Sequence, residues 1–493
     1  MSTIAAVPNQ TTNITPGSSA RVAALVGPCV TVGVATTVAM WIVWWITHLP
    51  AVSAAAPVTL VTLIATNLLI LTWQSSKAGR PAAVWVGLGG AAVAATLNLL
   101  ILGSLLGEQA ETTSEMASAA NTFRSEAPLI VMSFFGASAV CGVIAGLAGR
   151  ALGGASERLE PRRWLARYAT ILAIGFVPLL AVGGSVTSTE SGMAVPDAVT
   201  SYDAVSFLFP ISLMAEPRIF LEHTHRLFGT LIGAAAILLV FQTFFTRAPM
   251  RYRVMSIVLL ALVIVQGLLG IARVSEIVRG WPGLSAIPEA YWATLHGIKG
   301  QGVFAFAVWT AAAISGSATI TESSLPGRTM TFARRAKTIG GFAIVALAIQ
   351  LVFGALSRHT GAPHALWSHV GWSVVVAMTV FIVAVLLASA DQLSETGSKL
   401  RTLGKSIMVV VSLQIALGFA ALLAVGNSGS DRPIPTADEL ATAAPIAAGE
   451  AFATTFHQTL GAVLLGLVVL ATVRAAQVSK IANDTAQTPA EAG

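Results

Sequence analysis

The chain has 493 residues, of which 55% are hydrophobic and only 10% are charged. This composition excludes a soluble globular protein and indicates a polytopic membrane protein. The formal net charge of +6 does not indicate a nucleic-acid partner, because the basic residues fall in short loops between apolar runs, as the positive-inside rule expects.

Twelve apolar segments are long enough to cross about 30 Å of hydrocarbon as helices. Helices are expected because backbone groups in lipid need internal partners, and the runs are too long and uniform for barrel strands. The predicted fold is an all-α polytopic membrane protein whose last eight helices form two pseudo-repeated four-helix bundles. The predicted spans lie near residues 22–47, 52–74, 82–105, 128–149, 164–185, 225–246, 253–273, 291–314, 337–357, 366–388, 403–425 and 452–475.

Charge and composition also divide the chain. Most of the 28 Lys and Arg residues lie on one side of the spans, which places both termini in the cytoplasm. Tryptophans 41, 44 and 45 lie near the outer end of the first span, and we expect them to form an interfacial aromatic belt rather than a ligand site. The predicted units are a cytoplasmic tail at 1–21, an accessory four-helix unit at 22–150, a first half at 151–330, a second half at 331–477 and a cytoplasmic tail at 478–493.

A short motif, Gln-x-x-x-Gly, recurs in spans seven, nine and eleven. Both of its residues lie on one face of a helix. One interpretation is ordinary small-residue packing with a polar hydrogen bond between helices, but recurrence in three odd-numbered spans favours a shared architectural role. The three copies are Gln266–Gly270, Gln350–Gly354 and Gln414–Gly418.

Four histidines lie near the outer start of spans six, eight, ten and twelve: His225, His296, His369 and His457. A single intramembrane histidine is usually a packing residue, but four at matched depth on equivalent helices favour ligands. Two pairs facing each other across a bundle suit the axial ligation of two haems, whereas zinc would favour convergence of ligands at one point. Glycine follows three of them one turn later, which we interpret as clearance for a flat macrocycle: Gly229, Gly300 and Gly461.

Charged residues cluster around the first of these histidines. Glu222 shares a helical face with His225, whereas His223 points about 200° away, so His225 is the candidate ligand. Glu222 is a candidate catalytic acid, with a capping or salt-bridge role as the alternative. Arg226, Arg273 and Arg358 end helices on the outer side, where they would bind haem propionates or simply snorkel. His359 and His364 would be surface residues or line the mouth of the site.

The segment Glu222-x-x-His225-Arg226, followed by Leu-Phe-Gly-Thr-Leu-Ile-Gly, resembles the Glu-x-x-His-Arg signature of haem A synthases. The run from Gly183 to Asp197, with its Gly-Gly and Ser-Gly pairs, is similar to the loop after that family's first helix. Counterparts also exist for Gln266–Val274, Gly354–Gly361 and His457-Gln458. The resemblance covers about 164–475.

The resemblance implies an enzyme that oxidises the C8 methyl of haem O to the formyl group of haem A. His225 and His296 would flank the substrate haem, His369 and His457 would ligate a resident haem b, and Glu222 would be the acid near the methyl. It further implies the bacterial inner membrane with its lipid, an unidentified electron acceptor, and links to haem O synthase and cytochrome oxidase assembly. A homo-oligomer is left open.

The sequence departs from the family pattern in four places. The outer loop 186–224 lacks the cysteine pair of some bacterial members, Val370 follows His369 where arginine is usual, and Thr187 replaces an arginine. The segment 22–150 has no counterpart. Two other functions fit part of the pattern: a non-enzymatic di-haem b electron carrier linked to quinol, and a transporter with internal repeats.

Overall fold

The structure is a computed structural model that describes residues 18–108, 122–196, 211–275, 281–283, 286–316, 327–391, 394–428 and 434–487. These residues contain no strand and include twelve helices that are long and apolar enough to cross a membrane. The predicted all-α polytopic membrane fold is therefore confirmed.

The first four long helices form what we call the N-terminal unit: α1 (Ser18–His48), α2 (Ala56–Ser76), α3 (Ala83–Ile101) and α5 (Ala127–Leu152), with a short 3₁₀ turn η1 (Gly103–Leu106) after α3. Helices α3 and α5 approach so closely that only glycine fits between them. A Cβ on Gly87 would lie 2.7 Å from the Gly142 carbonyl oxygen and 2.8 Å from Gly146 Cα. Small residues at such crossings let membrane helices pack tightly.

The first half consists of α6 (Pro161–Ser188), α7 (Pro217–Phe245), α8 (Met250–Val274) and α10 (Glu289–Gly316), with a 3₁₀ turn η3 (Ile211–Ala215) before α7. Helix α6 packs on α7 and α10, and α8 packs on the same two helices. Helices α7 and α10 therefore lie diagonally across the bundle. Its core is well packed, and the buried Tyr168 hydroxyl donates to the Ala235 carbonyl at 2.6 Å.

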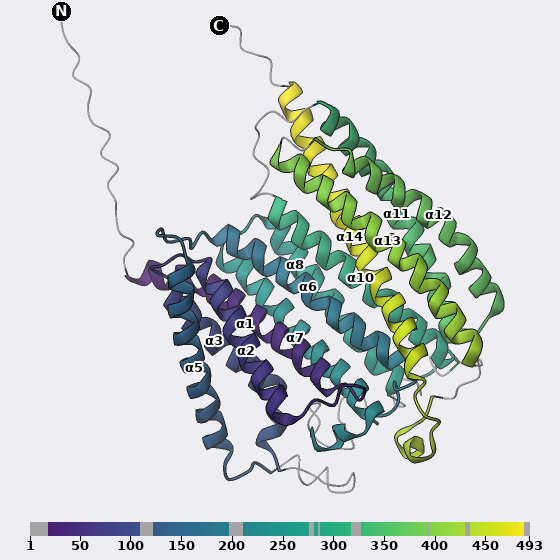
Figure 1. Cartoon of the computed structure of the whole chain (residues 1–493), viewed down its shortest axis with the longest axis horizontal. Coiled ribbons are helices and arrows are strands. Elements are labelled where there is room, and N and C mark those ends of the chain that lie inside the picture. The colour runs from purple at the N-terminus through teal and green to yellow at the C-terminus, as the bar shows by residue number, and fades with distance from the viewer. Residues whose placement is uncertain are drawn as a thin grey trace, which may run out of the picture.

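The second half repeats this arrangement with α11 (Gly327–Thr360), α12 (Pro363–Ala388), α13 (Glu395–Ser428) and α14 (Ala448–Gln487), and a 3₁₀ turn η4 (Ala437–Thr442) before α14. Each helix packs on its neighbours in the order α11, α12, α13, α14 and back to α11. Helix α14 also packs on α6 and α10, so it joins the two halves. Figure 1 shows the N-terminal unit, the first half and the second half side by side, and α1 begins on the side where α14 ends.

Several helices extend beyond the predicted apolar spans. Helix α7 begins at Pro217 rather than near 225, and α14 continues to Gln487 through part of the segment predicted as a tail. Helices α11 and α13 also begin eight or more residues before their predicted starts. Hydropathy detects only the lipid-embedded part of a helix, so the polar turns that continue it into water are missed. The division into domains stays a prediction.

The tryptophans of α1 pack inside the protein. Trp41 is 4% exposed and donates through Nε1 to Asn98 Oδ1 at 2.9 Å. Its ring also meets the ring of Phe228 on α7 at 6.0 Å, and Trp44 meets Phe220 at 5.8 Å. The predicted interfacial belt is wrong for Trp41, because this ring lies at the contact between the N-terminal unit and the first half.

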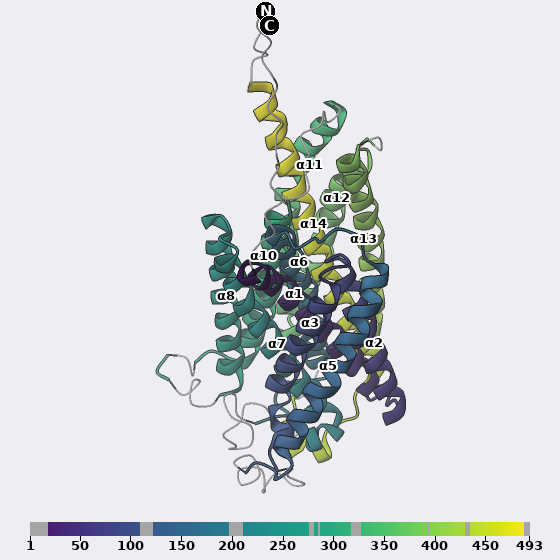
Figure 2. The same cartoon turned by 90° about the vertical axis from the view of Figure 1, so that its left-hand side faces the viewer.

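Figure 2, seen from the N-terminal unit, shows the helices of all three sets running in roughly the same direction.

Candidate functional site

The four histidines form two pairs, one in each half. The rings of His225 on α7 and His296 on α10 have centroids 6.2 Å apart and planes inclined at 76°. The rings of His369 on α12 and His457 on α14 have centroids 6.1 Å apart and planes inclined at 78°. All four lie six to nine residues after the first residue of their helix. We call the pairs the first-half site and the second-half site.

The separation within each pair fits a single metal ion between the rings. A metal bonded to one nitrogen of each ring would place the ring centres about 6.3 Å apart, since each metal–nitrogen bond is about 2.0–2.1 Å and each nitrogen lies roughly 1.1 Å from its ring centre. Within the described residues, no group of three or more His, Cys, Asp or Glu side chains could hold a metal ion. The donor set is thus two imidazoles per site, which suits axial ligation of a macrocyclic metal better than a tetrahedral zinc site.

Each imidazole lies against a glycine on the preceding long helix. A Cβ on Gly183 would lie 2.9 Å from His225 Cε1, and one on Gly354 would lie 2.8 Å from His369 Cε1. Such distances leave no space for any side chain, so glycine is required where the ring crosses the neighbouring backbone. The other two pairs are slightly less close. A Cβ on Gly270 would lie 3.3 Å from His296 Cε1, and one on Gly418 would lie 3.1 Å from His457 Cε1.

The glutamine of the Gln-x-x-x-Gly motif holds the histidine of the next helix. Gln266 Nε2 donates to the His296 carbonyl at 2.9 Å, and Gln350 Nε2 donates to the His369 carbonyl at 2.9 Å. Gln414 Nε2 lies 3.1 Å from His457 Nδ1. The motif therefore combines an imidazole cradle with a hydrogen bond from the glutamine amide.

The histidine tautomer is defined in one case. His369 Nδ1 lies 3.0 Å from the Gln350 carbonyl oxygen. Because a carbonyl can only accept, Nδ1 carries the proton and Nε2 has the lone pair, with Gln350 Nε2 3.3 Å from it.

The glycines one turn after the histidines do not all have the predicted role. A Cβ on Gly300 would lie 3.1 Å from Gln266 Nε2, and one on Gly461 would lie 3.0 Å from Gln414 Nε2. These two glycines make space for a glutamine amide, so the interpretation as clearance for a macrocycle is wrong for them. Of the three glycines that follow a paired histidine by one turn, Gly229 alone has no atom within 4 Å of an added Cβ.

Glu222 joins the loop after α6 to helix α7. Its Oε2 accepts from the Val195 backbone N–H at 2.8 Å, and its Oε1 pairs with Arg226 Nη2 at 2.7 Å. The same Arg226 nitrogen donates to the Val195 carbonyl at 3.0 Å. The carboxylate is 5% exposed. The capping alternative is wrong, because the N-cap of α7 is Glu216, whose side chain accepts from the Ile219 N–H, whereas the salt-bridge alternative is realised.

The other two candidate arginines are also paired with carboxylates of the chain. Arg273 Nε lies 2.6 Å from Glu289 Oε1. Arg358 pairs with Glu190 and donates to the Thr187 carbonyl at 2.6 Å. Arg273 and Arg358 lie in the last turns of α8 and α11, but Arg226 lies inside α7, nine residues after Pro217, so the prediction that it ends its helix is wrong. The role of the three arginines in binding propionates stays a prediction.

Contacts between the halves include groups that the sequence analysis missed. The buried Arg218 donates through Nη1 to the Thr189 carbonyl and through Nη2 to the Ala444 carbonyl at 2.6 Å. The Thr454 hydroxyl donates to the Ser188 hydroxyl at 2.8 Å. The partners of Arg218 are backbone carbonyls, which have no residue signature, so no sequence pattern could have indicated this contact.

The remaining histidines divide by position. His359 on α11 lies within electrostatic range of His296 and Arg273, so the second half contributes a side chain to the edge of the first-half site. His223 is fully buried, and His364 is exposed at the start of α12.

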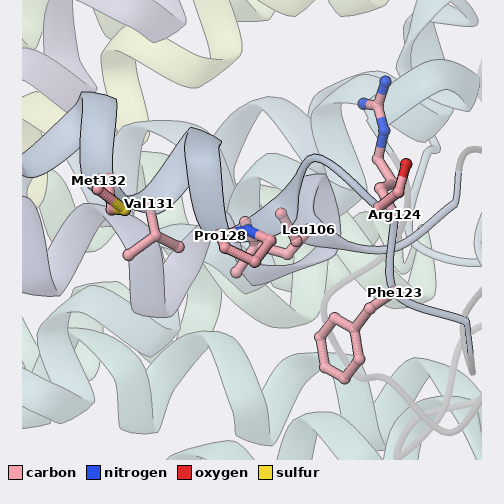
Figure 3. Close-up of a pocket in the computed structure, with 8 residues that line it drawn as sticks. Leu106, Phe123, Arg124, Pro128, Val131 and Met132 are labelled. Atoms are coloured by element: carbon pink, nitrogen blue, oxygen red, sulfur yellow. The ribbon is translucent and has the colours of Figure 1, made fainter.

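A surface hollow of about 580 Å³ lies at the start of α5. Its lining is mostly apolar, and Figure 3 shows Arg124 and Phe123 pointing in opposite directions at one end of it. None of the four paired histidines lines this hollow. It is therefore separate from both histidine sites.

The fold and the site define a polytopic helical membrane protein in which two repeated four-helix bundles each place a histidine pair on a diagonal. Residues 166–372 match the family COX15-CtaA, described as cytochrome oxidase assembly protein. The match covers 207 of the 493 residues, and over these residues the chain is similar to that family, the haem A synthase family. The matched segment includes the first half and α11, with His225, His296 and His369, and it leaves out the N-terminal unit. Comparison with curated proteins and with solved structures finds no match.

The matched residues are similar to proteins with a role in cytochrome oxidase assembly.

Proposed function

We propose that the protein is a haem A synthase, which oxidises the C8 methyl of haem O to the formyl group of haem A for a terminal oxidase. The observation that carries this proposal is an asymmetry between two otherwise equal sites. Both sites present two imidazoles at about the same separation, but only His225 has a buried acid, Glu222, one turn before it on the same helix. An acid beside one site supports chemistry there and electron relay at the other.

The substrate haem O would be held by His225 and His296, and a resident haem b would be held by His369 and His457. When bound, haem b would supply a metal centre that accepts and passes on single electrons. The protein orients both groups through its glycine cradles and hydrogen bonds. Because His369 Nδ1 donates to the Gln350 carbonyl at 3.0 Å, this imidazole is held in the tautomer whose Nε2 lone pair can bind a metal.

Glu222 is the proposed catalytic acid–base group. Converting a methyl to a formyl group replaces two hydrogen atoms on the carbon with one oxygen atom, so an oxygen source, a proton acceptor and an electron path are all needed. Glu222 is held in one place by the Val195 N–H and Arg226, which is the positioning that general acid–base catalysis requires. The same contacts keep the 189–195 segment, which includes Thr189 and Ser191, against α7.

The proposed setting is the bacterial inner membrane, with both termini in the cytoplasm. A haem O synthase would supply the substrate, and cytochrome oxidase would take up the product. The reaction also requires an electron acceptor and a source of the formyl oxygen atom.

The direct experiment is co-expression of the full chain with a haem O supply, followed by extraction and mass analysis of the haems. The wild-type protein should produce haem A. Glu222→Gln should keep its haem but accumulate haem O or a hydroxylated intermediate. The matched control is Glu395→Gln, which removes an exposed i,i+4 pair with Lys399 and should leave the haem A yield unchanged.

Two results would overturn the proposal. Full haem A yield from Glu222→Gln would remove the catalytic role of this residue. Purified wild-type protein that contains only haem b, with no haem O or haem A, would instead establish a di-haem electron carrier.

A further inference from the structure

The residue three positions after each paired histidine lies almost one helical turn further into the membrane. Three of these four residues are uncharged and one is a lysine. In chain order they are Phe228, Lys299, Trp372 and Leu460. A charged side chain inside a membrane span is costly and usually functional, so Lys299 distinguishes the first-half site from its repeat.

Lys299 and Trp372 make equivalent contacts in the two halves. Lys299 Nζ donates to the Leu262 carbonyl on α8 at 2.8 Å, and Trp372 Nε1 donates to the Ala346 carbonyl on α11 at 2.9 Å. Each of these carbonyls lies four residues before the glutamine of the Gln-x-x-x-Gly motif on its helix. The repeat therefore keeps a hydrogen bond between helices at this position, with a cationic donor in the first half and a neutral donor in the second.

The Lys299 side chain does not extend toward the outer surface. A snorkelling lysine carries its ammonium group to the headgroups, whereas Leu262 is the middle residue of α8. Its carbonyl lies one turn deeper than Gln266, whose amide binds the His296 carbonyl. Lys299 is half-buried and lies within electrostatic range of His296. It therefore places a positive charge beside the first-half site, within the membrane.

This positive charge has no carboxylate partner among the described residues. The three arginines considered above each pair with a glutamate: Arg226 with Glu222, Arg273 with Glu289 and Arg358 with Glu190. The partner of Lys299 is a neutral backbone carbonyl. Its charge therefore acts on the first-half site without a neighbouring negative charge to offset it.

We infer that Lys299 raises the reduction potential of the haem held between His225 and His296. This inference rests on the proposed function, which places one haem in each half. A ferric haem loses one positive charge when it is reduced, so a fixed positive charge nearby favours the reduced state. For unit charges about 10 Å apart at an effective dielectric constant of about 20, the effect on the reduction equilibrium is roughly tenfold. Trp372 is uncharged and has no such effect on the second-half site.

The test is a spectroscopic redox titration of purified full-length protein that contains haem A and haem b. The two haems are followed separately, because the formyl group moves the visible band of haem A to longer wavelength. Lys299→Met removes the charge from an unbranched side chain and should lower the potential of haem A by about 59 mV, which is a tenfold change for one electron. It should leave haem b unchanged. The reverse variant, Trp372→Lys, should raise the potential of haem b by a similar amount.

The matched control is Lys299→Arg, which keeps the charge and a donor and should leave both potentials unchanged. An unchanged haem A potential in Lys299→Met would overturn the inference and leave the proposed function intact. An equal fall in Lys299→Met and Lys299→Arg would also overturn it, because the effect would then come from packing and not from charge.

A failure of the proposed function gives a different result. Wild-type protein that contains only haem b, with no haem O or haem A, would defeat the proposed function. The titration would then be carried out on His369→Ala, which lacks a second-half ligand, so the effect of Lys299 on a haem in the first half is tested in either case.

Discussion

The two halves of the molecule present nearly the same pair of imidazoles in different surroundings. The ring separations are 6.2 Å and 6.1 Å, and the angles between ring planes are 76° and 78°. Beside the first pair lies a buried Glu222–Arg226 ion pair, and one of its members, His296, contacts a glutamine, whereas both members of the second pair contact a glutamine. The repeat thus preserves ligand geometry and varies the groups behind it. Such a division suits one site that exchanges its ligand and one that keeps it.

The largest expected effect comes from removing single histidines. His369→Ala should abolish haem b binding and retain haem O or haem A, whereas His225→Ala should do the reverse, because the two histidines of each pair belong to the same half. Haem content per protein, measured after extraction, distinguishes the two. His364→Ala, exposed on the same helix as His369, is the control and should retain both haems. Loss of both haems from either single variant would show that the sites are not independent.

A smaller effect is expected from filling one glycine cradle. Gly354→Ala would place a methyl 2.8 Å from His369 Cε1, and overpacking of this kind costs about 1–3 kcal/mol. We expect reduced haem b content and a lower thermal unfolding midpoint. Gly341→Ala on the same helix, where an added Cβ meets nothing within 4 Å, should do neither. The account of the cradle is wrong if the two variants hold equal amounts of haem b.

The smallest effect concerns the contact between the halves. Arg218→Gln would leave the carbonyls of Thr189 and Ala444 without their charged donor. The expected loss is about 1–2 kcal/mol of unfolding free energy, with the haem content of both sites retained. Arg163→Gln, whose side chain is 65% exposed in its pair with Glu160, should not change stability in the same thermal unfolding experiment. An equal unfolding midpoint for both variants would contradict a joining role for Arg218.

Much of this comparison could be predicted from the sequence. Hydropathy predicted twelve spans, and the matched depth of four histidines predicted two pairs, which the structure places side by side with their ring planes nearly perpendicular. The spacing of Gln-x-x-x-Gly indicated a shared role, but only the structure shows that each glutamine reaches the next helix. The glycines one turn after the histidines were misread because helical spacing says which face a residue occupies, not what lies opposite. Gly229 and Gly300 share the spacing, and only Gly300 faces a glutamine amide.

The acid at the first-half site shows a second limit of sequence reasoning. Hydropathy placed the start of α7 near His225, which made Glu222 a candidate cap. The helix in fact begins at Pro217 with Glu216 as its N-cap, because Pro217 favours the first turn and Glu216 accepts from the Ile219 N–H. Glu222 accepts a hydrogen bond from the Val195 N–H in the loop after α6. Every residue except proline has a backbone N–H, so the residue types in the sequence could not indicate this partner.

The central claim is that each half holds one haem between two nearly perpendicular imidazoles, and electron paramagnetic resonance of the oxidised protein tests it most directly. Near-perpendicular ligand planes leave two iron d orbitals almost equal in energy, which gives a low-spin signal with a strongly shifted, large g value. The ring angles of 76° and 78° predict two such signals from protein loaded with both haems, one of which is lost in His369→Ala. A high-spin signal from either site, or a single low-spin species that His369→Ala leaves intact, would contradict the account.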